Sequence, residues 1–124
     1  MVICHKSRLR ANEVAEMRII GDVKGLDVLL VDDMVDTAGT ITKAANLMMD
    51  NGAKSVRAIA SHAVMSDPAS TRVDQSALTE MIFTDSIPYA KKCAKVKVLS
   101  IADMFAEAIR RVCSGESISS LYKI

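Results

Sequence analysis

The stretch that decides the fold is an aliphatic run followed by acidic and small polar residues, Val28-Leu29-Leu30-Val31-Asp32-Asp33-Met34-Val35-Asp36-Thr37-Ala38-Gly39-Thr40. The run from Leu26 to Val31 is continuous enough to be a strand buried on both faces of a parallel sheet. Apolar residues then recur at helical spacing from Ile41 to Met49, and Asn51-Gly52 supplies a left-handed cap. The stretch therefore predicts a strand, a turn and a helix.

Strands and helices alternate along the rest of the chain, which is typical of an α/β fold. Ser100 and Asp103 have the spacing of a capping box that starts the last helix, and that helix carries a single apolar stripe. We therefore expect a mainly parallel sheet flanked by helices, with its ligand outside the carboxyl ends of the strands. The expected elements are strands at 56–60, 81–84 and 96–99, a short helix after Asp67-Pro68, and an amphipathic helix at 101–112.

The amino end follows a different pattern. Residues 2–4 are apolar and residues 5–18 are polar with little periodicity, which predicts a strand stub that leads into a flexible loop. The length of 124 residues fits one domain, so we assign 1–124 to a single domain.

The composition favours a protein that binds small molecules. Apolar residues make up 50% of the chain but aromatic residues only 3%. The core is therefore expected to consist of aliphatic residues and methionines, of which the chain has eight. A net charge of +1 gives no basic field for nucleic acid, and no apolar run approaches the roughly 20 residues of a membrane span. The three cysteines form no Cys-x-x-Cys pair, and the charged amino end does not fit a signal peptide. We expect a cytoplasmic protein with no nucleic-acid or membrane partner.

The turn before the first helix has the chemistry of an anion site. The first N–H groups of a helix lack partners within the helix, and the dipole adds about half a positive charge there. A phosphate can therefore be held at this turn without a lysine. The expected phosphate ligands are Asp36, Thr37, Ala38, Gly39 and Thr40, with Gly39 allowing close approach.

Two adjacent carboxylates beside an anion site would repel a lone phosphate. A phosphorylated ribose resolves this conflict, because Asp32 and Asp33 can accept hydrogen bonds from vicinal hydroxyls or hold Mg²⁺ through water. A helix capped by one ordinary Asp is the simpler alternative. Three Asp, two Thr and one Gly within 32–40 argue against it. The turn also lacks the lysine of a Walker loop and the three glycines of a dinucleotide site.

The pattern Val-Asp-Asp-x-x-Asp-Thr-Ala-Gly-Thr at 31–40 resembles the phosphoribosyl diphosphate signature of type I phosphoribosyltransferases and ribose-phosphate pyrophosphokinases, and Ala38 favours the second family. Other segments resemble the pyrophosphokinases in the same order along nearly the whole chain. The resemblance is to the carboxy-terminal half of that family and implies a type I phosphoribosyltransferase-like fold with truncated amino-terminal strands. The matching segments are 6–8, 11–12, 19–25, 51–53, 60–62, 84–88, 96–100 and 117–121.

The resemblance implies a ribose-phosphate diphosphokinase. That reaction moves the β,γ-diphosphoryl group of ATP to the anomeric hydroxyl of ribose 5-phosphate, with Mg²⁺, and gives phosphoribosyl diphosphate for nucleotide biosynthesis. Residues 26–40 would be the ribose-phosphate loop, and Lys6 and Arg8 match catalytic cations that reach the nucleotide phosphates. Ser117, Ser119 and Tyr122 fall in a segment that resembles part of a regulatory phosphate or ADP site, although a simple docking tail is an equal alternative.

The chain also departs from the family. His5 and Ser7 replace an acid and an arginine, while Ala63 and Asp67 stand where glycine is common, which puts allosteric behaviour in doubt. The family is longer, and its amino-terminal half supplies the ATP pocket, the principal magnesium ligands and much of the oligomer interface. We therefore expect ATP to bind only with that half, the chain alone to be inactive, and its uncovered apolar surface to cause self-association into a homo-oligomer.

Two other functions stay open. A compact type I phosphoribosyltransferase shares the loop but needs a hood that binds the base, and no segment here is a candidate for one. A non-catalytic regulatory homologue would keep the ligand loop without transfer, and the retention of Lys6 and Arg8 argues only weakly against it.

Overall fold

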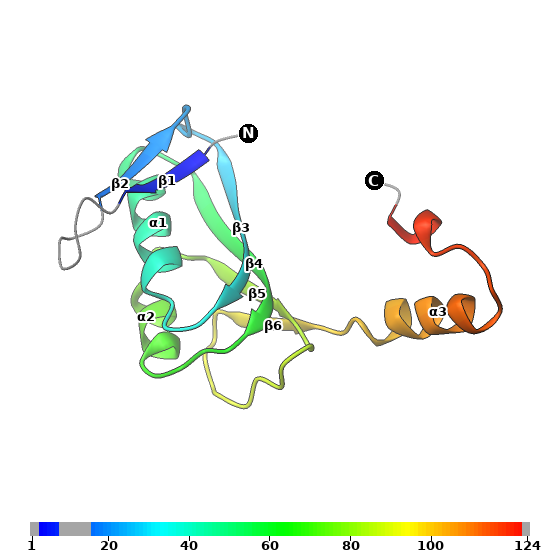
Figure 1. The fold of residues 1–124 in the computed structure, drawn as a ribbon. Helices are drawn as coiled ribbons and strands as arrows, with labels where there is room; N and C mark the ends of the chain where they lie inside the picture. The colour runs from blue at the N-terminus through cyan, green and yellow to red at the C-terminus, as the bar shows by residue number, and fades with distance from the viewer. Residues whose placement is uncertain (1–2, 8–15, 123–124) are drawn as a thin grey trace.

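The computed structural model describes residues 3–7 and 16–122 of the chain. Its body is a sheet with two helices on one face, and a third helix stands away from the body on an extended connection (Figure 1). The elements are β1 Ile3–Ser7, β2 Glu16–Ile20, β3 Asp27–Val35, α1 Gly39–Asp50, β4 Ser55–Ala63, α2 Ala69–Gln75, β5 Glu80–Thr84, β6 Val96–Leu99, α3 Ala102–Cys113 and the short 3-10 helix η1 Ser119–Tyr122.

The main sheet has the strand order β3-β4-β5-β6, and every neighbouring pair is parallel. Because each strand lies beside the next one in the chain, the connecting helices α1 and α2 fall on the same face of the sheet (Figure 1). The carboxyl ends of all four strands then meet at one edge. The predicted mainly parallel α/β fold is confirmed.

The core lies between the sheet and the helices α1 and α2. Its largest side chains are each at most 2% exposed and include Phe83, Met48, Met65, Leu78 and Met81. Alternate residues of β4 are small and fully buried, which lets α1 pack closely on the strand. Apart from Phe83 the core is aliphatic and includes three methionines, Met48, Met65 and Met81, as the composition predicts.

The amino end differs from the expected stub and loop. Strands β1 and β2 form an antiparallel pair from Ile3↔Ile20 to Ser7↔Glu16. The expectation of a loop is therefore wrong for 5–7 and 16–18, because backbone pairing between two segments leaves no periodic apolar signal in a mostly polar sequence. The part of that loop at 8–15 lies outside the described residues.

The helix ends test the expected caps. Gly52 has φ 86° after α1, as Asn51-Gly52 predicts. The capping box before α3 is wrong: Ile101 holds the N-cap position without a side-chain bond, and the Ser100 hydroxyl instead accepts from the Ala102 N–H at 3.3 Å. Helix α2 ends at Gln75, earlier than its apolar pattern suggests.

Two apolar surfaces remain uncovered. On the sheet face opposite α1, the side chains of Leu29 and Val31 are 58% and 76% exposed. Helix α3 buries none of its residues, so its predicted apolar stripe faces solvent, with Phe105 53% and Ile109 61% exposed. None of the helices within the described ranges is long and apolar enough to cross a membrane.

Candidate functional site

The site lies at the carboxyl end of β3, where the strand passes into α1. Strand β3 runs on to Val35, so Asp32 and Asp33 belong to the strand itself and do not follow it as expected. Pairing with β4 extends it, with Asp32 opposite Ala60 and Met34 opposite His62. Successive residues of a strand alternate between its faces, so Asp32 and Asp33 belong to different faces of β3. That both carboxylates approach one ribose stays a prediction.

Local hydrogen bonds orient the acidic side chains. Oδ1 of Asp32 accepts from the Asp33 N–H at 3.0 Å, and Oδ1 of Asp33 accepts from the Met34 N–H at 2.7 Å. Asp32, Asp33 and Asp36 are all exposed, so their charges remain solvated. Carboxylates in this setting can exchange water for ligand hydroxyls or a hydrated cation at low cost.

A cavity of about 240 Å³ opens at this point. Asp32 lines it, whereas Asp33 does not. The structure thus brings six of the seven expected ribose-phosphate residues around one cavity. Its lining comprises Asp32, Met34, Val35, Asp36, Thr37, Ala38, Gly39, Thr40 and Ile41.

The amino end of α1 closes this cavity without a side-chain cap. Ala38 occupies the N-cap position, so none of the nearby acids caps the helix, and the simpler alternative of a capping Asp is wrong. Ala38 has φ 58° and ψ 5°, a left-handed conformation that costs an L-residue about 1–2 kcal/mol. Gly39 does not have a positive φ. The strained position of the turn is therefore Ala38, although the sequence singles out Gly39.

The strained turn is held by its helix. The Thr42 hydroxyl donates to the Ala38 carbonyl at 2.7 Å, and the Thr42 N–H donates to the same oxygen at 3.1 Å. Ala38 and Thr42 are only 4% and 7% exposed. Strain of this kind persists only where the surroundings fix it, and it is common at ligand sites.

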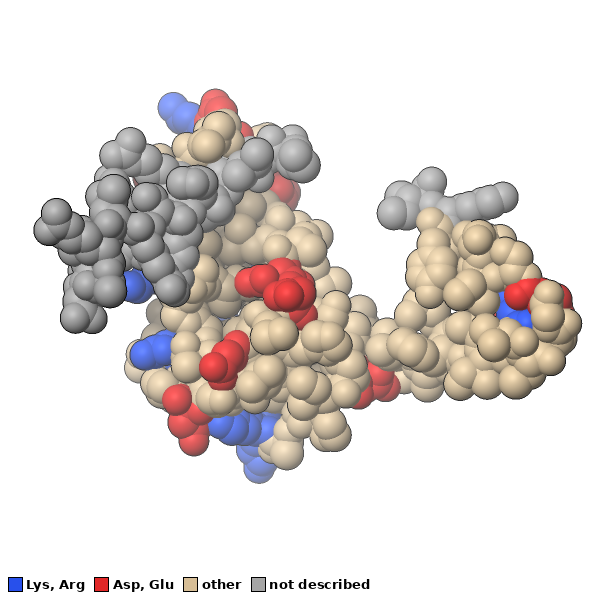
Figure 2. Space-filling view, in the orientation of Figure 1, with Lys and Arg blue, Asp and Glu red and all other residues tan. Residues whose placement is uncertain are grey.

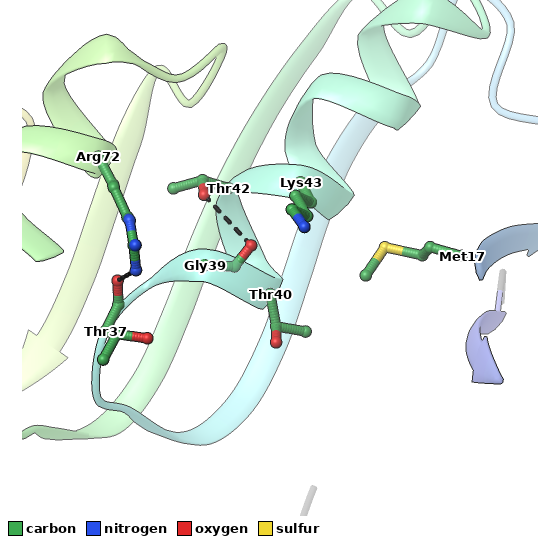
Figure 3. A pocket seen from close by; sticks show the side chains of 7 residues that line it. All are labelled: Met17, Thr37, Gly39, Thr40, Thr42, Lys43 and Arg72. Carbon is green, nitrogen blue, oxygen red and sulfur yellow. Dashed lines mark hydrogen bonds between the residues drawn. The ribbon is translucent and has the colours of Figure 1, made fainter. Parts of the chain in front are cut away.

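A second cavity of about 430 Å³ lies beside the same turn (Figure 3). Three residues, Thr37, Gly39 and Thr40, line both cavities, so the turn forms a wall between them. The second cavity carries two cations, from α1 and α2, and its lining comprises Met17, Thr37, Gly39, Thr40, Thr42, Lys43 and Arg72. The turn thus has acidic residues on one side and basic residues on the other.

The sequence pattern did not predict Lys43 or Arg72 as site residues. A cation near the amino end of a helix opposes the dipole, so Lys43 in α1 is a weak signal that could have been noticed. Arg72 lies 35 residues after Thr37 and reaches the turn because α2 follows β4, the neighbour of β3 in the sheet. No local pattern marks it.

The other expected site residues lie elsewhere. Lys6 is in β1 opposite Met17, which lines the larger cavity, and Arg8 lies outside the described residues. Ser117, Ser119 and Tyr122 lie at or near η1, beyond α3, and none of them lines either cavity. The Ser119 N–H donates to the Ser117 hydroxyl at 3.2 Å, and Tyr122 is 64% exposed.

One residue that departs from the expected family pattern, Asp67, forms an ion pair. The Asp67 carboxylate pairs with Lys91 Nζ at 2.6 Å, and Lys91 also donates to the Met65 carbonyl at 2.9 Å. Met65 is buried and has φ 49°. The acid that replaces the usual glycine therefore helps to place the lysine that fixes this turn after β4.

No cluster of three or more His, Cys, Asp or Glu that could hold a metal occurs within the described ranges. Asp32 and Asp36 do line the same cavity. Mg²⁺ is commonly held by one or two carboxylates together with substrate phosphates and several waters. The donor set therefore fits a magnesium ion that arrives with a phosphorylated ligand better than a permanently bound metal.

Comparison with known proteins gives a consistent picture. The chain is 80% identical over 122 residues to the ribose-phosphate pyrophosphokinase of Porphyromonas gingivalis. The matched stretch covers 98% of this chain and 39% of that relative. It is 46% identical to ribose-phosphate pyrophosphokinase A of Dictyostelium discoideum, which again covers 98% of this chain and 39% of the relative. The crystal structure of phosphoribosylpyrophosphate synthetase from Mycobacterium smegmatis has a TM-score of 0.80 at 40% identity, over 92% of this chain and 37% of that one.

The chain spans about two fifths of the length of these relatives. The expectation that it is a carboxy-terminal half is not supported by these matches, which cover less than half of each relative. The family described as phosphoribosyl synthetase-associated domain matches residues 5–123, nearly the whole chain. The predicted resemblance is confirmed at the level of the family, and the chain belongs to the phosphoribosyl synthetase-associated domain family.

Proposed function

We propose that this chain provides the ribose 5-phosphate site of a ribose-phosphate diphosphokinase. One observation carries the proposal: Asp32 and the uncapped amino end of α1 line the same cavity. The Asp32 carboxylate suits the hydroxyls of a sugar, and the amino end of α1 suits a phosphate. The names of the relatives support the same function, and a phosphorylated ribose is the ligand that uses both ends of the cavity.

Each end of the cavity would perform a distinct task. Backbone N–H groups at the start of α1, with the hydroxyls of Thr37 and Thr40, would bind the 5-phosphate and fix the orientation of the sugar. The Asp32 carboxylate would accept a hydrogen bond from a ribose hydroxyl and so hold the anomeric carbon at the open side. The anomeric hydroxyl would then lose its proton to water while its oxygen attacks the β-phosphorus of ATP, the bond from that phosphorus to the α-phosphate oxygen would break, and AMP would leave.

Magnesium and the remaining cations belong to the same proposal. Asp32 and Asp36 would hold Mg²⁺ through water next to the substrate, and the ion would offset charge on the transferring phosphate oxygens. Lys6, in β1, and Arg8 would approach the phosphates of ATP. The adenine pocket would come from the part of the relatives' length that this chain does not span.

Calorimetric titration tests the proposal most simply. With MgCl₂ present, ribose 5-phosphate is expected to bind at one site, ribose without phosphate much more weakly, and ATP not measurably. Binding of ATP without binding of ribose 5-phosphate would contradict the proposal. Formation of phosphoribosyl diphosphate by the purified chain would contradict the expectation that it is inactive alone, and transfer of a phosphoribosyl group to a free base would favour a phosphoribosyltransferase instead.

A further inference from the structure

We infer that Arg72 is a positioning residue for the phosphate-binding turn between β3 and α1. The inference rests on the proposed function, since it concerns how that turn is held ready for its ligand. It starts from one contact between separate elements: Nη1 of Arg72, in α2, donates a hydrogen bond of 2.9 Å to the carbonyl oxygen of Thr37 (Figure 3).

The direction of this bond determines where the next N–H group points. In a trans peptide the carbonyl and the following N–H point in opposite directions. When the Thr37 carbonyl points toward Arg72, the Ala38 N–H must therefore point away from it. The linings of the two cavities agree with this direction, because Arg72 lines the larger one whereas Ala38 lines the smaller one with Asp32.

The turn needs such an anchor because Ala38 is left-handed, at φ 58°. Without a fixed Thr37 carbonyl, rotation of the peptide between Thr37 and Ala38 would relieve the strain and turn the N–H away from the ligand. Thr42 holds the carbonyl of Ala38, on the far side of the strained residue. Arg72 and Thr42 thus fix the peptide groups on both sides of Ala38.

Gly39 lies beside the contact between Arg72 and Thr37. A β-carbon at position 39 would lie 3.5 Å from Arg72 Nη1 and 3.9 Å from Thr37 Oγ1. These are ordinary contact distances, so a methyl group would fit but would fill the space between the guanidinium and the turn.

The test compares Arg72→Ala with Arg72→Lys, and Arg57→Ala serves as the control. Arg57 is an exposed arginine in β4 whose ion pair to Glu80 has N···O 3.8 Å, and it lines neither cavity. We expect Arg72→Ala to weaken ribose 5-phosphate binding about tenfold, the scale of one charge-assisted hydrogen bond. Arg72→Lys should restore part of that loss, and Arg57→Ala should bind as the unchanged chain does.

A second readout separates positioning from direct contact with the ligand. In the ligand-free protein, Arg72→Ala should change the NMR coupling between the amide and α protons of Ala38, which reports its φ, whereas a charge that merely touches the phosphate would leave this coupling unchanged. Unchanged affinity, or lowered affinity with an unchanged coupling, would overturn the inference. If the unchanged chain fails to bind ribose 5-phosphate, the proposed function fails, and the coupling at Ala38 still decides the role of Arg72.

Discussion

The Thr42 hydroxyl donates a hydrogen bond of 2.7 Å to the carbonyl oxygen of Ala38, the left-handed residue at the start of α1. Both residues are buried, so the bond is shielded from water. Thr42→Val keeps the shape of the side chain and removes the donor, and it is expected to lower the free energy of unfolding by about 1 kcal/mol. A Thr42→Val chain that is as stable as the unchanged chain in urea denaturation would show that the hydroxyl is not what holds the turn.

Substitutions at Ala38 should separate backbone strain from packing. Ala38→Gly relieves about 1 kcal/mol of left-handed strain. It also removes a buried methyl group and raises the conformational entropy of the unfolded chain, and each of these effects destabilises the fold by a similar amount. The net change in the free energy of unfolding is therefore expected to stay within about 1 kcal/mol. Ala38→Val places a β-branched residue at φ 58° and should destabilise by well over that. A stable Ala38→Val chain in thermal denaturation would contradict the left-handed turn.

Asp32 and Asp33 should behave differently although they are neighbours. Asp32 lines the smaller cavity and Asp33 does not, while each accepts a hydrogen bond from the next backbone N–H. Asp32→Asn is expected to weaken ribose 5-phosphate binding several-fold and to leave the binding of inorganic phosphate unchanged or slightly stronger, because a repelling charge is gone. Asp33→Asn is the matched control and should change neither. Equal losses from both variants in calorimetry would mean that the two carboxylates act together.

The carboxyl half of α3 should be sensitive to acid. Hydrogen bonds from Arg110 and then Arg111 lower the pKa of Glu107 from 4.5 to about 2. Because the folded pKa is lowered, this contribution to stability is present above pH 4.5 and is lost as the pH falls through 2. Amide protection in α3 should therefore decline over that window, and less steeply in Glu107→Gln. A Glu107 carboxyl that titrates near 4.5 by NMR would contradict the ion-pair network.

Self-association is expected because both the open sheet face and α3 present apolar side chains. Val31 is 76% exposed and Ile109 61%. In Figure 2 much of the visible surface of α3 is uncharged, although the helix also carries Asp103, Glu107, Arg110 and Arg111. Burial of such side chains between copies would be favourable. Sedimentation velocity should show dimers or larger species, and Val31→Glu combined with Ile109→Glu should shift them toward monomer. A strict monomer at high concentration would disprove this expectation.

The sequence predicted the parts of the site that are continuous in the chain. The aliphatic run, the Asp-Thr-Ala-Gly-Thr turn and the helix to Asn51-Gly52 all lie within 26–52, and the structure has them in that order. Apolar periodicity reports burial along one segment, so it located β3 and α1 well. It could not fix where β3 ends, because that depends on pairing with β4, and the end of the strand decides which faces Asp32 and Asp33 belong to.

Contacts between distant segments were the other limit. Arg72 and the hairpin of β1 and β2 depend on pairing and packing between separate elements, which leave no mark on the local pattern. The stripe of α3 was located correctly, but its periodicity could not reveal that the stripe faces solvent in this chain. The left-handed conformation of Ala38 could be found only from the backbone geometry, because glycine is the residue normally expected at a positive φ.

The central claim is that the turn from Asp36 to Thr40 binds the phosphate of a phosphorylated ribose. Backbone amide NMR during titration with ribose 5-phosphate tests it most directly, with ribose and inorganic phosphate titrated separately for comparison. We predict saturable shifts that are largest at 36–40, smaller shifts at the same amides with phosphate alone, and shifts near Asp32 only when the sugar is present. Saturable shifts confined to other parts of the chain, or none at 36–40, would contradict the claim.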